Sequence, residues 1–207
     1  MAVMTTAAPN RYSDAPRLPE GAVIDPRALL AASVPIELEI GPGRGWFMVE
    51  RLVADPQVRM LGFEVSRKWT AEVNARLARR GLSGRGHVYA EDVRQVIVRI
   101  ADASVERVFV HFPDPWWKKR HQKRRVIADD VVVELARVVV PGGELFVQTD
   151  VPERAAEYEV TIGRRPEFVP GSTGARISDN PYGARSPRER RAIEDGLPIH
   201  RLLYRRR

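Results

Sequence analysis

The sequence of 207 residues contains no cysteine, which excludes disulfides, thiolate zinc sites and a cysteine nucleophile. It has no apolar run long enough to span a membrane, and its first residues lack the apolar core of a signal peptide. The histidines are few and scattered, without the spacing of metal ligands: His87, His111, His121 and His200. These absences predict a cytoplasmic protein that needs no metal, in which each histidine is structural or simply exposed.

Lysine is also rare, with four residues among 34 lysines and arginines, so the net charge of +7 comes mostly from arginine. A strongly basic chain favours a polyanionic partner, and arginine can pair with phosphate through two parallel hydrogen bonds and also stack on bases. The length fits one α/β domain. We expect a flexible leader over residues 1–22 and a single domain over 23–207; the oligomeric state stays open.

Segments with strand and helix patterns alternate along the chain and predict a mostly parallel sheet with helices on both faces. The expected strands cover residues 35–41, 58–65, 86–90, 105–112, 144–150 and 199–204. The expected helices cover residues 25–30, 47–53, 67–81, 93–101, 129–140 and 153–163, and residues 166–185 look rich in turns. Ligands of such sheets bind beyond the carboxyl ends of the strands. An acidic residue stands at or near each of five strand ends: Glu39, Glu64, Asp92, Asp114 and Asp150.

The first strand ends in three glycines, Gly41, Gly43 and Gly45, which suit a tight turn that approaches a ligand closely. The dinucleotide motif G-x-G-x-x-G would need its third glycine where Trp46 stands, which counts against a nicotinamide cofactor. Glu64 ends the next strand and can accept both hydroxyls of a ribose. An adenosine cofactor without a pyrophosphate remains, and S-adenosylmethionine is the leading candidate.

Two further acids suit this cofactor. Glu39 could face the positively charged methionyl end, where a carboxylate is electrostatically favourable. Asp92 stands where an adenine amino group would need an acceptor. For each residue a structural alternative stays open: an exposed Glu39 and an Asp92 that only caps a helix.

The most distinctive stretch, Phe112 to Arg125, begins where two prolines bracket Asp114 and end the fourth strand in a stiff turn. Trp116 follows, which could stack on a base or lock the loop. A basic strip comes next and predicts contacts with RNA phosphates, although many charge runs are only solvated surface: Lys118, Lys119, Arg120, Lys123, Arg124 and Arg125.

This stretch resembles the motif F-P-D-P-W-x-K-K-R-H-x-K-R-R of the bacterial tRNA (guanine-N7)-methyltransferase family, and the resemblance extends from about Ile36 to Tyr204. It implies a class I S-adenosylmethionine-dependent methyltransferase with a Rossmann-like, seven-stranded sheet that methylates a variable-loop guanine of tRNA. It also implies that Asp114 lies at the catalytic centre. Cofactor contacts carry over to Glu39, Glu64 and Asp92, and substrate contacts to Lys118, Asp150, Ser186 and Glu189. The family's T-x-[YF]-E aligns with Ser186-Pro-Arg-Glu189, so Arg188 replaces an aromatic residue.

Guanine N7 carries a lone pair and no proton, so its methylation needs alignment and charge stabilisation rather than a base. We therefore expect Asp114 to orient the guanine by accepting hydrogen bonds from its N1–H and 2-amino groups, a role that it could share with Glu189 or Asp150. Two alternatives stay open: a methyltransferase acting on another RNA or a small molecule, and a non-catalytic RNA-binding protein with this fold.

Overall fold

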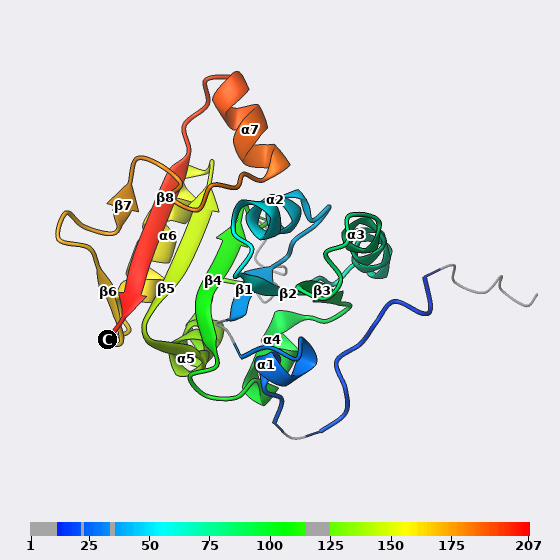
Figure 1. The fold of residues 1–207 in the computed structure, drawn as a ribbon. Coiled ribbons are helices and arrows are strands. Elements are labelled where there is room, and N and C mark those ends of the chain that lie inside the picture. Colours follow the sequence, from blue (N-terminus) through cyan, green and yellow to red (C-terminus); the bar gives the residue numbers. More distant parts are fainter. Residues whose placement is uncertain (1–11, 22, 34–35, 115–124) are drawn as a thin grey trace, which may run out of the picture.

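The structure is a computed structural model that describes residues 12–21, 23–33, 36–114 and 125–207. Its centre is a sheet with the strand order β3-β2-β1-β4-β5-β8-β6, and the two-residue strand β7 pairs with β8 (Figure 1). Strands β1 to β5 are parallel to one another, whereas β8 runs antiparallel to β5. The strands are β1 (Ile36–Ile40), β2 (Arg59–Phe63), β3 (Gly86–Tyr89), β4 (Val105–His111), β5 (Val139–Thr149), β6 (Phe168–Pro170), β7 (Arg176–Ile177) and β8 (His200–Arg206).

Helices cover both faces of the sheet, as the alternating pattern predicts (Figure 1). Their bounds are α1 (Pro26–Leu29), α2 (Trp46–Ala54), α3 (Arg67–Arg79), α4 (Val93–Val96), the 3-10 helix η1 (Ile97–Arg99), α5 (Asp129–Val138), α6 (Pro152–Gly163) and α7 (Pro187–Glu194). One apolar core joins the sheet to α4, α5 and α6, and the other joins the opposite face to α2 and α3. The α/β prediction is therefore confirmed.

The structure differs from the expected elements in the last third of the chain. Helix α7 was not expected, and β6 and β7 lie within the stretch read as turns. The strand expected over 144–150 begins earlier in the structure, because β5 begins at Val139 and includes Pro141, Gly142 and Gly143. A shift of register beside Val105 admits this sequence, and a Cβ on Gly143 would lie 2.5 Å from the carbonyl oxygen of Glu106. Glycine therefore permits the close approach of two strands here.

The described part of the expected leader, residues 12–21, packs against the domain. The side chain of Leu18 is buried in the core, and its backbone N–H donates to Glu91 Oε1 at 3.1 Å. The guanidinium of Arg17 pairs with the same carboxylate at 2.9 Å. The Ala90 N–H donates to the carbonyl of Pro16 at 2.7 Å. The division of the chain at residue 22 stays a prediction, and the contacts bring residues 16–18 to the segment after β3.

Candidate active site

The loop between β1 and α2 has the open, tight form expected of a ligand-binding turn. Gly41, Gly43 and Gly45 all have positive φ, between 52° and 70°, a region that favours glycine. A Cβ on Gly45 would lie 2.5 Å from Val73 Cγ1, so this glycine also lets α2 approach α3. Cβ atoms built on Gly41 and Gly43 would meet no atom within 4 Å. The loop is thus tight toward the core and open on its other side.

A cavity of about 530 Å³ adjoins this loop at the carboxyl edge of the sheet. It brings together the ends of β1, β4 and β5 with the start of α7, an arrangement that the acids at the strand ends predict. Six of the predicted site residues line it: Glu39, Gly41, Gly43, Asp114, Asp150 and Ser186. The rest of the lining consists of Pro42, Arg44, Phe47, His111, Phe112, Pro113, Val151, Pro187 and Arg188.

Glu39 is a buried acid that faces the cavity, with 2% of its surface exposed. Its Oε2 atom has no hydrogen-bond partner among the residues that the structure describes. Burial, reinforced by the charge of Glu64, raises the pKa of Glu39 from 4.5 to about 8, and the Met48 N–H opposes this rise. The alternative of an exposed Glu39 is therefore wrong. A buried carboxylate without a counter-charge suits a cationic ligand such as a sulfonium.

Glu64 holds the glycine loop in place. Its Oε2 accepts the Gly43 N–H at 3.0 Å, and its Oε1 accepts the Ser66 N–H at 2.8 Å. The carboxylate thus joins the end of β2 to both the loop and the start of α3. Glu64 lies outside the described lining of the cavity, and its contact with a ribose stays a prediction.

Asp92 caps helix α4, which is the structural alternative that the sequence left open. Its Oδ1 accepts the Arg94 N–H at 3.1 Å and the Arg94 Nε–H at 2.8 Å. This hydrogen bonding to Arg94 lowers the pKa of Asp92 below its usual value. A contact between Asp92 and an adenine stays a prediction.

The turn after β4 presents Asp114 to the cavity. Phe112 begins this turn with a φ of 48°, which is rare for any residue but glycine and rarer still before a proline. Its N–H donates to the Gln148 carbonyl on β5 at 2.8 Å and fixes this backbone against the sheet. Such a conformation costs about 1–3 kcal/mol and persists only where the surroundings impose it. The side chain of Asp114 is exposed.

Asp150 pairs with Arg188 across the cavity, from the end of β5 to the first turn of α7. The Arg188 Nε–H donates to Asp150 Oδ2 at 2.9 Å, and a second nitrogen of the guanidinium contacts the same oxygen. Arg188 stands where the family has an aromatic residue. Asp150, which is predicted to contact the substrate, is therefore paired with a cation of the protein itself.

Ser186 and Glu189 belong to the start of α7 and have structural contacts. Ser186 Oγ accepts the Glu189 N–H at 3.2 Å and caps the helix. The carboxylate of Glu189 has no exposed surface, and it accepts hydrogen bonds from Asn180 at 2.9 Å and from Arg201 at 3.1 Å. Glu189 lies outside the described lining, so its predicted contact with a base stays a prediction.

His111 is a lining residue that the sequence analysis did not assign to the site. Its Nδ1 lies 2.8 Å from Gln148 Oε1, and its ring lies 4.1 Å from that of Phe47. Burial lowers the pKa of His111 from 6.5 to about 4, so the ring is neutral at pH 7. Its Nε2 has no hydrogen-bond partner in the described ranges. Its place next to Phe112 is the only signal that the sequence offers.

Most of the predicted phosphate-binding strip lies outside the described residues, namely Lys118, Lys119, Arg120, Lys123 and Arg124. Arg125 is described, and it forms an ion pair with Glu157 on α6. Its contact with phosphate stays a prediction.

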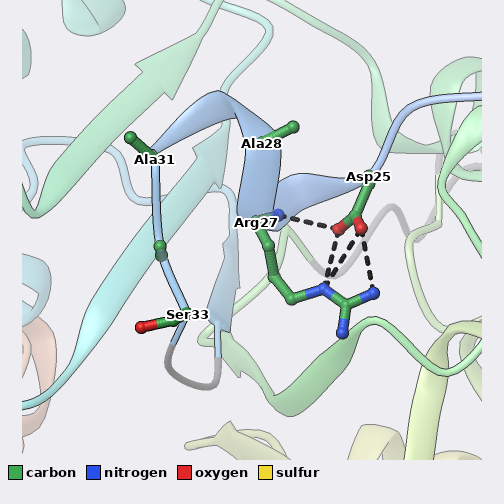
Figure 2. Close-up of a pocket in the computed structure, with 6 residues that line it drawn as sticks. Asp25, Arg27, Ala28, Ala31 and Ser33 are labelled. Carbon is green, nitrogen blue, oxygen red and sulfur yellow. Dashed lines mark hydrogen bonds and ion pairs between the residues drawn. The ribbon is translucent and has the colours of Figure 1, made fainter.

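A second hollow, of about 570 Å³, lies beside α1 (Figure 2). Its two charged side chains bind each other, with Arg27 Nη2 at 2.9 Å from Asp25 Oδ2, and the rest of its lining is small. This hollow plays no part in the proposed site.

In the part of the chain that the structure describes, no group of three or more acidic or histidine side chains could hold a metal ion. None of the helices described is long and apolar enough to cross a membrane.

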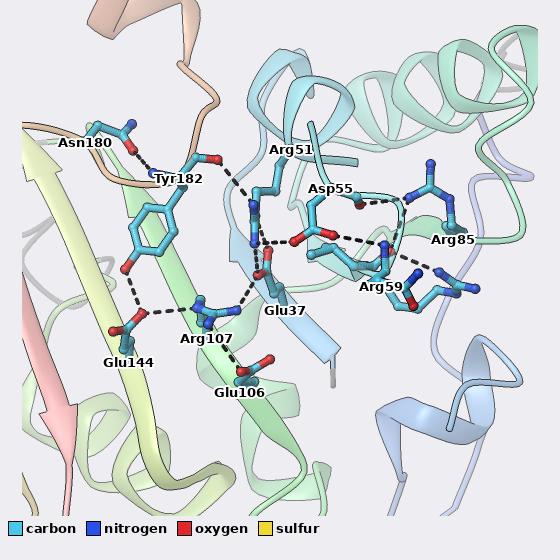
Figure 3. A network of polar contacts seen from close by, with 12 residues as sticks. Glu37, Arg51, Asp55, Arg59, Arg85, Glu106, Arg107, Glu144, Asn180 and Tyr182 are labelled. Carbon is cyan, nitrogen blue, oxygen red and sulfur yellow. Dashed lines mark hydrogen bonds and ion pairs between the residues drawn. The ribbon is translucent and has the colours of Figure 1, made fainter. Parts of the chain in front are cut away.

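A buried network of charges anchors the segment that leads into α7 (Figure 3). Tyr182 inserts its ring between Phe109 and Phe146 and donates its hydroxyl to Glu144 Oε2 at 3.1 Å. Arg51 on α2 donates to the Tyr182 carbonyl at 3.3 Å. These contacts fix the residues just before Ser186 to the sheet and to α2, and so position one side of the cavity.

The sheet order, the glycine loop and the cavity at the carboxyl edge define a class I S-adenosylmethionine-dependent methyltransferase fold. The structure resembles the geranyl diphosphate C-methyltransferase of Streptomyces coelicolor with a TM-score of 0.57 and 15% identity, over 86% of this chain and 75% of that one. It also resembles an rRNA methylase of Streptococcus thermophilus with a TM-score of 0.55 and 13% identity, over 87% of this chain and 93% of that one. At these identities the likeness concerns the fold alone.

The sequence matches a more particular group. The model of a family described as putative methyltransferases covers residues 33–202. The tRNA (guanine-N(7)-)-methyltransferase of Rhodopirellula baltica is 34% identical over 90% of this chain and 71% of its own length. The enzyme of that name from a Synechococcus species is 35% identical over 84% of this chain and 73% of its own. The chain belongs to the bacterial tRNA (guanine-N7)-methyltransferase family.

Proposed function

We propose that this protein transfers a methyl group from S-adenosylmethionine to N7 of a guanine in tRNA, the variable-loop guanine by analogy with its family. Family membership supports the reaction. The observation that carries the proposal is one cavity lined both by Glu39, a buried acid without a counter-charge, and by Asp114, an exposed acid on a constrained turn. Glu39 suits a cationic methyl donor, and Asp114 suits the nucleobase that receives the methyl group.

The residues present fit the cofactor. Glu39 would face its cationic methionyl end, and the open side of Gly41 and Gly43 would admit that end close to the backbone. Glu64 would exchange one of its backbone contacts for the ribose hydroxyls. The cofactor supplies an electrophilic methyl group on a positively charged sulfur. Everything else in the reaction concerns how the chain holds the guanine.

Asp114 would select and orient the guanine. Its carboxylate accepts hydrogen bonds from N1–H and the 2-amino group, a pattern that guanine offers and adenine does not. The negative charge also offsets the positive charge that grows on the ring as N7 is methylated. No proton is removed from N7, so Asp114 orients and stabilises rather than acting as a base.

The Arg188–Asp150 pair supports a second candidate, a guanine-methylating enzyme with a different RNA substrate. In the family pattern an aromatic residue stands at this position, where it could stack on a base. Here a guanidinium stands instead and occupies Asp150. A planar cation also stacks on bases and pairs with phosphate, so the entrance of the cavity still suits RNA rather than a small apolar molecule.

The test is a labelled-methyl assay with the full chain, S-adenosylmethionine and unmodified tRNA, followed by nucleoside analysis of the product. We expect 7-methylguanosine as the labelled nucleoside. Labelled 7-methylguanosine from a parallel assay with ribosomal RNA, and none from tRNA, would favour the second candidate, whereas label on another nucleoside would contradict both. Binding of tRNA without any transfer would favour the non-catalytic alternative.

A further inference from the structure

A second basic surface, which we call the α3 surface, lies outside the basic strip. It consists of two tryptophans and six cations from α3, its two ends, the glycine loop and the first residue of α2: Trp46, Trp69, Arg44, Arg67, Lys68, Arg76, Arg79 and Arg80. Helix α3 packs against the sheet through Thr70, Val73 and Leu77, so its other faces point away from the core. Figure 1 shows α3 beside α2, at the edge of the fold.

The tryptophan rings hold several of these cations in place. The guanidinium of Arg76 lies 4.5 Å and that of Arg80 5.7 Å from the centre of the Trp46 ring. Arg44 and Lys68 lie 5.2 Å and 5.1 Å from the centre of the Trp69 ring. Each stack reduces the rotamer freedom that a bound anion would otherwise have to restrict. The cations are therefore partly ordered before any ligand arrives.

The surface has little negative charge of its own. Among the described residues, the single ion pair on this surface joins Lys68 to Glu72 on the same helix at 4.0 Å. Desolvation and the charges of Arg79, Arg80 and Arg44 lower the pKa of Arg76, and the charge of Glu72 opposes this shift without cancelling it. Such crowding of like charges is unfavourable by itself and is relieved by a polyanion.

The α3 surface is continuous with the candidate active site. Arg44 lines the cavity, stacks on Trp69 and accepts a hydrogen bond from Arg76 at its carbonyl oxygen. From this residue the cations run along a helix of 13 residues, a length of about 20 Å. A strand of RNA with its guanine in the cavity has a cationic path beside it.

We infer that the α3 surface binds the ribose–phosphate backbone of the tRNA substrate next to the target guanosine, as a second electrostatic contact besides the basic strip. This inference rests on the proposed function. The planar guanidinium of arginine can donate two parallel hydrogen bonds to phosphate oxygens, and contacts of this kind position RNA without reading its sequence. The surface therefore contributes affinity and orientation, whereas the cavity selects the base.

The test compares the salt dependence of tRNA binding in two double variants of the full chain. Arg76→Gln with Arg80→Gln removes two cations of the α3 surface. Arg205→Gln with Arg207→Gln removes the same charge at the end of β8, which is antiparallel to β5 and so ends at the edge opposite the cavity. The measurement is the dissociation constant of unmodified, in vitro-transcribed tRNA between 50 and 300 mM salt, with cofactor binding as a check of folding.

In the α3 variant the slope of log affinity against log salt falls by about 1.5, because two phosphate contacts are lost, and the KM for tRNA rises. The control variant retains most of the slope. If both variants change the slope equally, the inference is overturned. If the first variant folds poorly, Arg67→Gln with Arg79→Gln, two exposed residues, gives the same test. Failure of the proposed function is distinct, because the unaltered chain then forms no 7-methylguanosine.

Discussion

Glu37 and Glu39 lie two residues apart on β1 and so point to the same side of the sheet, and both are at most 2% exposed. Glu37 accepts hydrogen bonds from Arg51 at 2.7 Å and 2.9 Å and from Arg107 at 2.9 Å (Figure 3). Glu39 has an oxygen without any partner in the described structure. The same residue type on the same strand is thus fully neutralised at one position and left without a cation at the next.

The difference separates an acid that holds the fold from an acid that awaits a ligand. The partners of Glu37 come from α2 and β4, and Arg107 continues the network to Glu144 on β5 at 3.1 Å. The network therefore joins β1, α2, β4 and β5 with the Tyr182 segment. Glu39 lies two residues closer to the carboxyl edge of the sheet, where it faces the cavity and not an arginine. A buried acid that the protein does not pair with a cation is a candidate for function.

Of the substitutions that test this comparison, removal of Glu37 should have the largest effect, and it should act on stability. Glu37→Ala leaves Arg51 and Arg107 without their shared counter-charge in a buried site, so we expect a loss of about 3–5 kcal/mol in the free energy of unfolding. Urea denaturation followed by circular dichroism measures this loss. Glu106→Gln serves as the control, because Glu106 contacts the same Arg107 at 3.3 Å from a partly exposed position. The control should lose at most about 1 kcal/mol, and an equal loss in both variants would contradict a special role for Glu37.

Removing Asp114 should affect the reaction and spare the fold. Asp114→Ala removes the acceptor that orients the guanine, so we expect methyl transfer to fall about 10² to 10³-fold. The affinity for S-adenosylmethionine and the unfolding free energy should stay close to those of the unaltered chain. Single-turnover transfer and cofactor titration measure the two effects, with Asp179→Ala, an exposed acid in a loop, as control. A collapse of cofactor binding would instead assign Asp114 to the cofactor site or to the fold.

The smallest expected effect concerns the ionisation of Glu39. With its pKa raised from 4.5 to about 8, the folded chain holds a proton that the unfolded chain releases between these values. The stability that this proton contributes is complete below pH 4.5 and is lost as the pH rises through 8. A bound sulfonium favours the ionised carboxylate, so cofactor affinity should rise toward pH 9, at most about tenfold per pH unit below the pKa.

Glu39→Gln isolates this effect, because it keeps the shape and removes the titration. Between pH 7 and 9 the cofactor affinity of the unaltered chain should rise, whereas that of the variant should be lower and should not change with pH. At pH 9 the variant should be more stable than the unaltered chain. Calorimetric titrations in two buffers would report release of a proton on binding near pH 7 by the unaltered chain alone. A pH dependence that persists in Glu39→Gln would show that another group is responsible.

The start of α7 carries a sequence pattern that fits both a helix start and a substrate contact. Ser186-Pro-Arg-Glu189 has a capping serine, a proline at the first helical position and an acid three residues later, which together indicate a helix start. The same four residues also align with the family's substrate motif. In the structure Ser186 caps α7, and the Glu189 side chain binds Asn180 and Arg201. A polar pattern of this kind serves a helix and a ligand equally well until its surroundings are known.

The alternation of strands and helices can be predicted from the sequence, and with it that the acids at or near the ends of β1, β2, β3, β4 and β5 stand at one edge beside a glycine loop. Local periodicity and turn chemistry suffice for this, because parallel strands align their carboxyl ends. Which of these acids lack a cationic partner depends on the tertiary structure. Arg51, Arg107, Arg188 and Arg201 reach Glu37, Asp150 and Glu189 from 12 to 70 residues away. Such pairings depend on packing between distant elements, and no spacing along the chain encodes them.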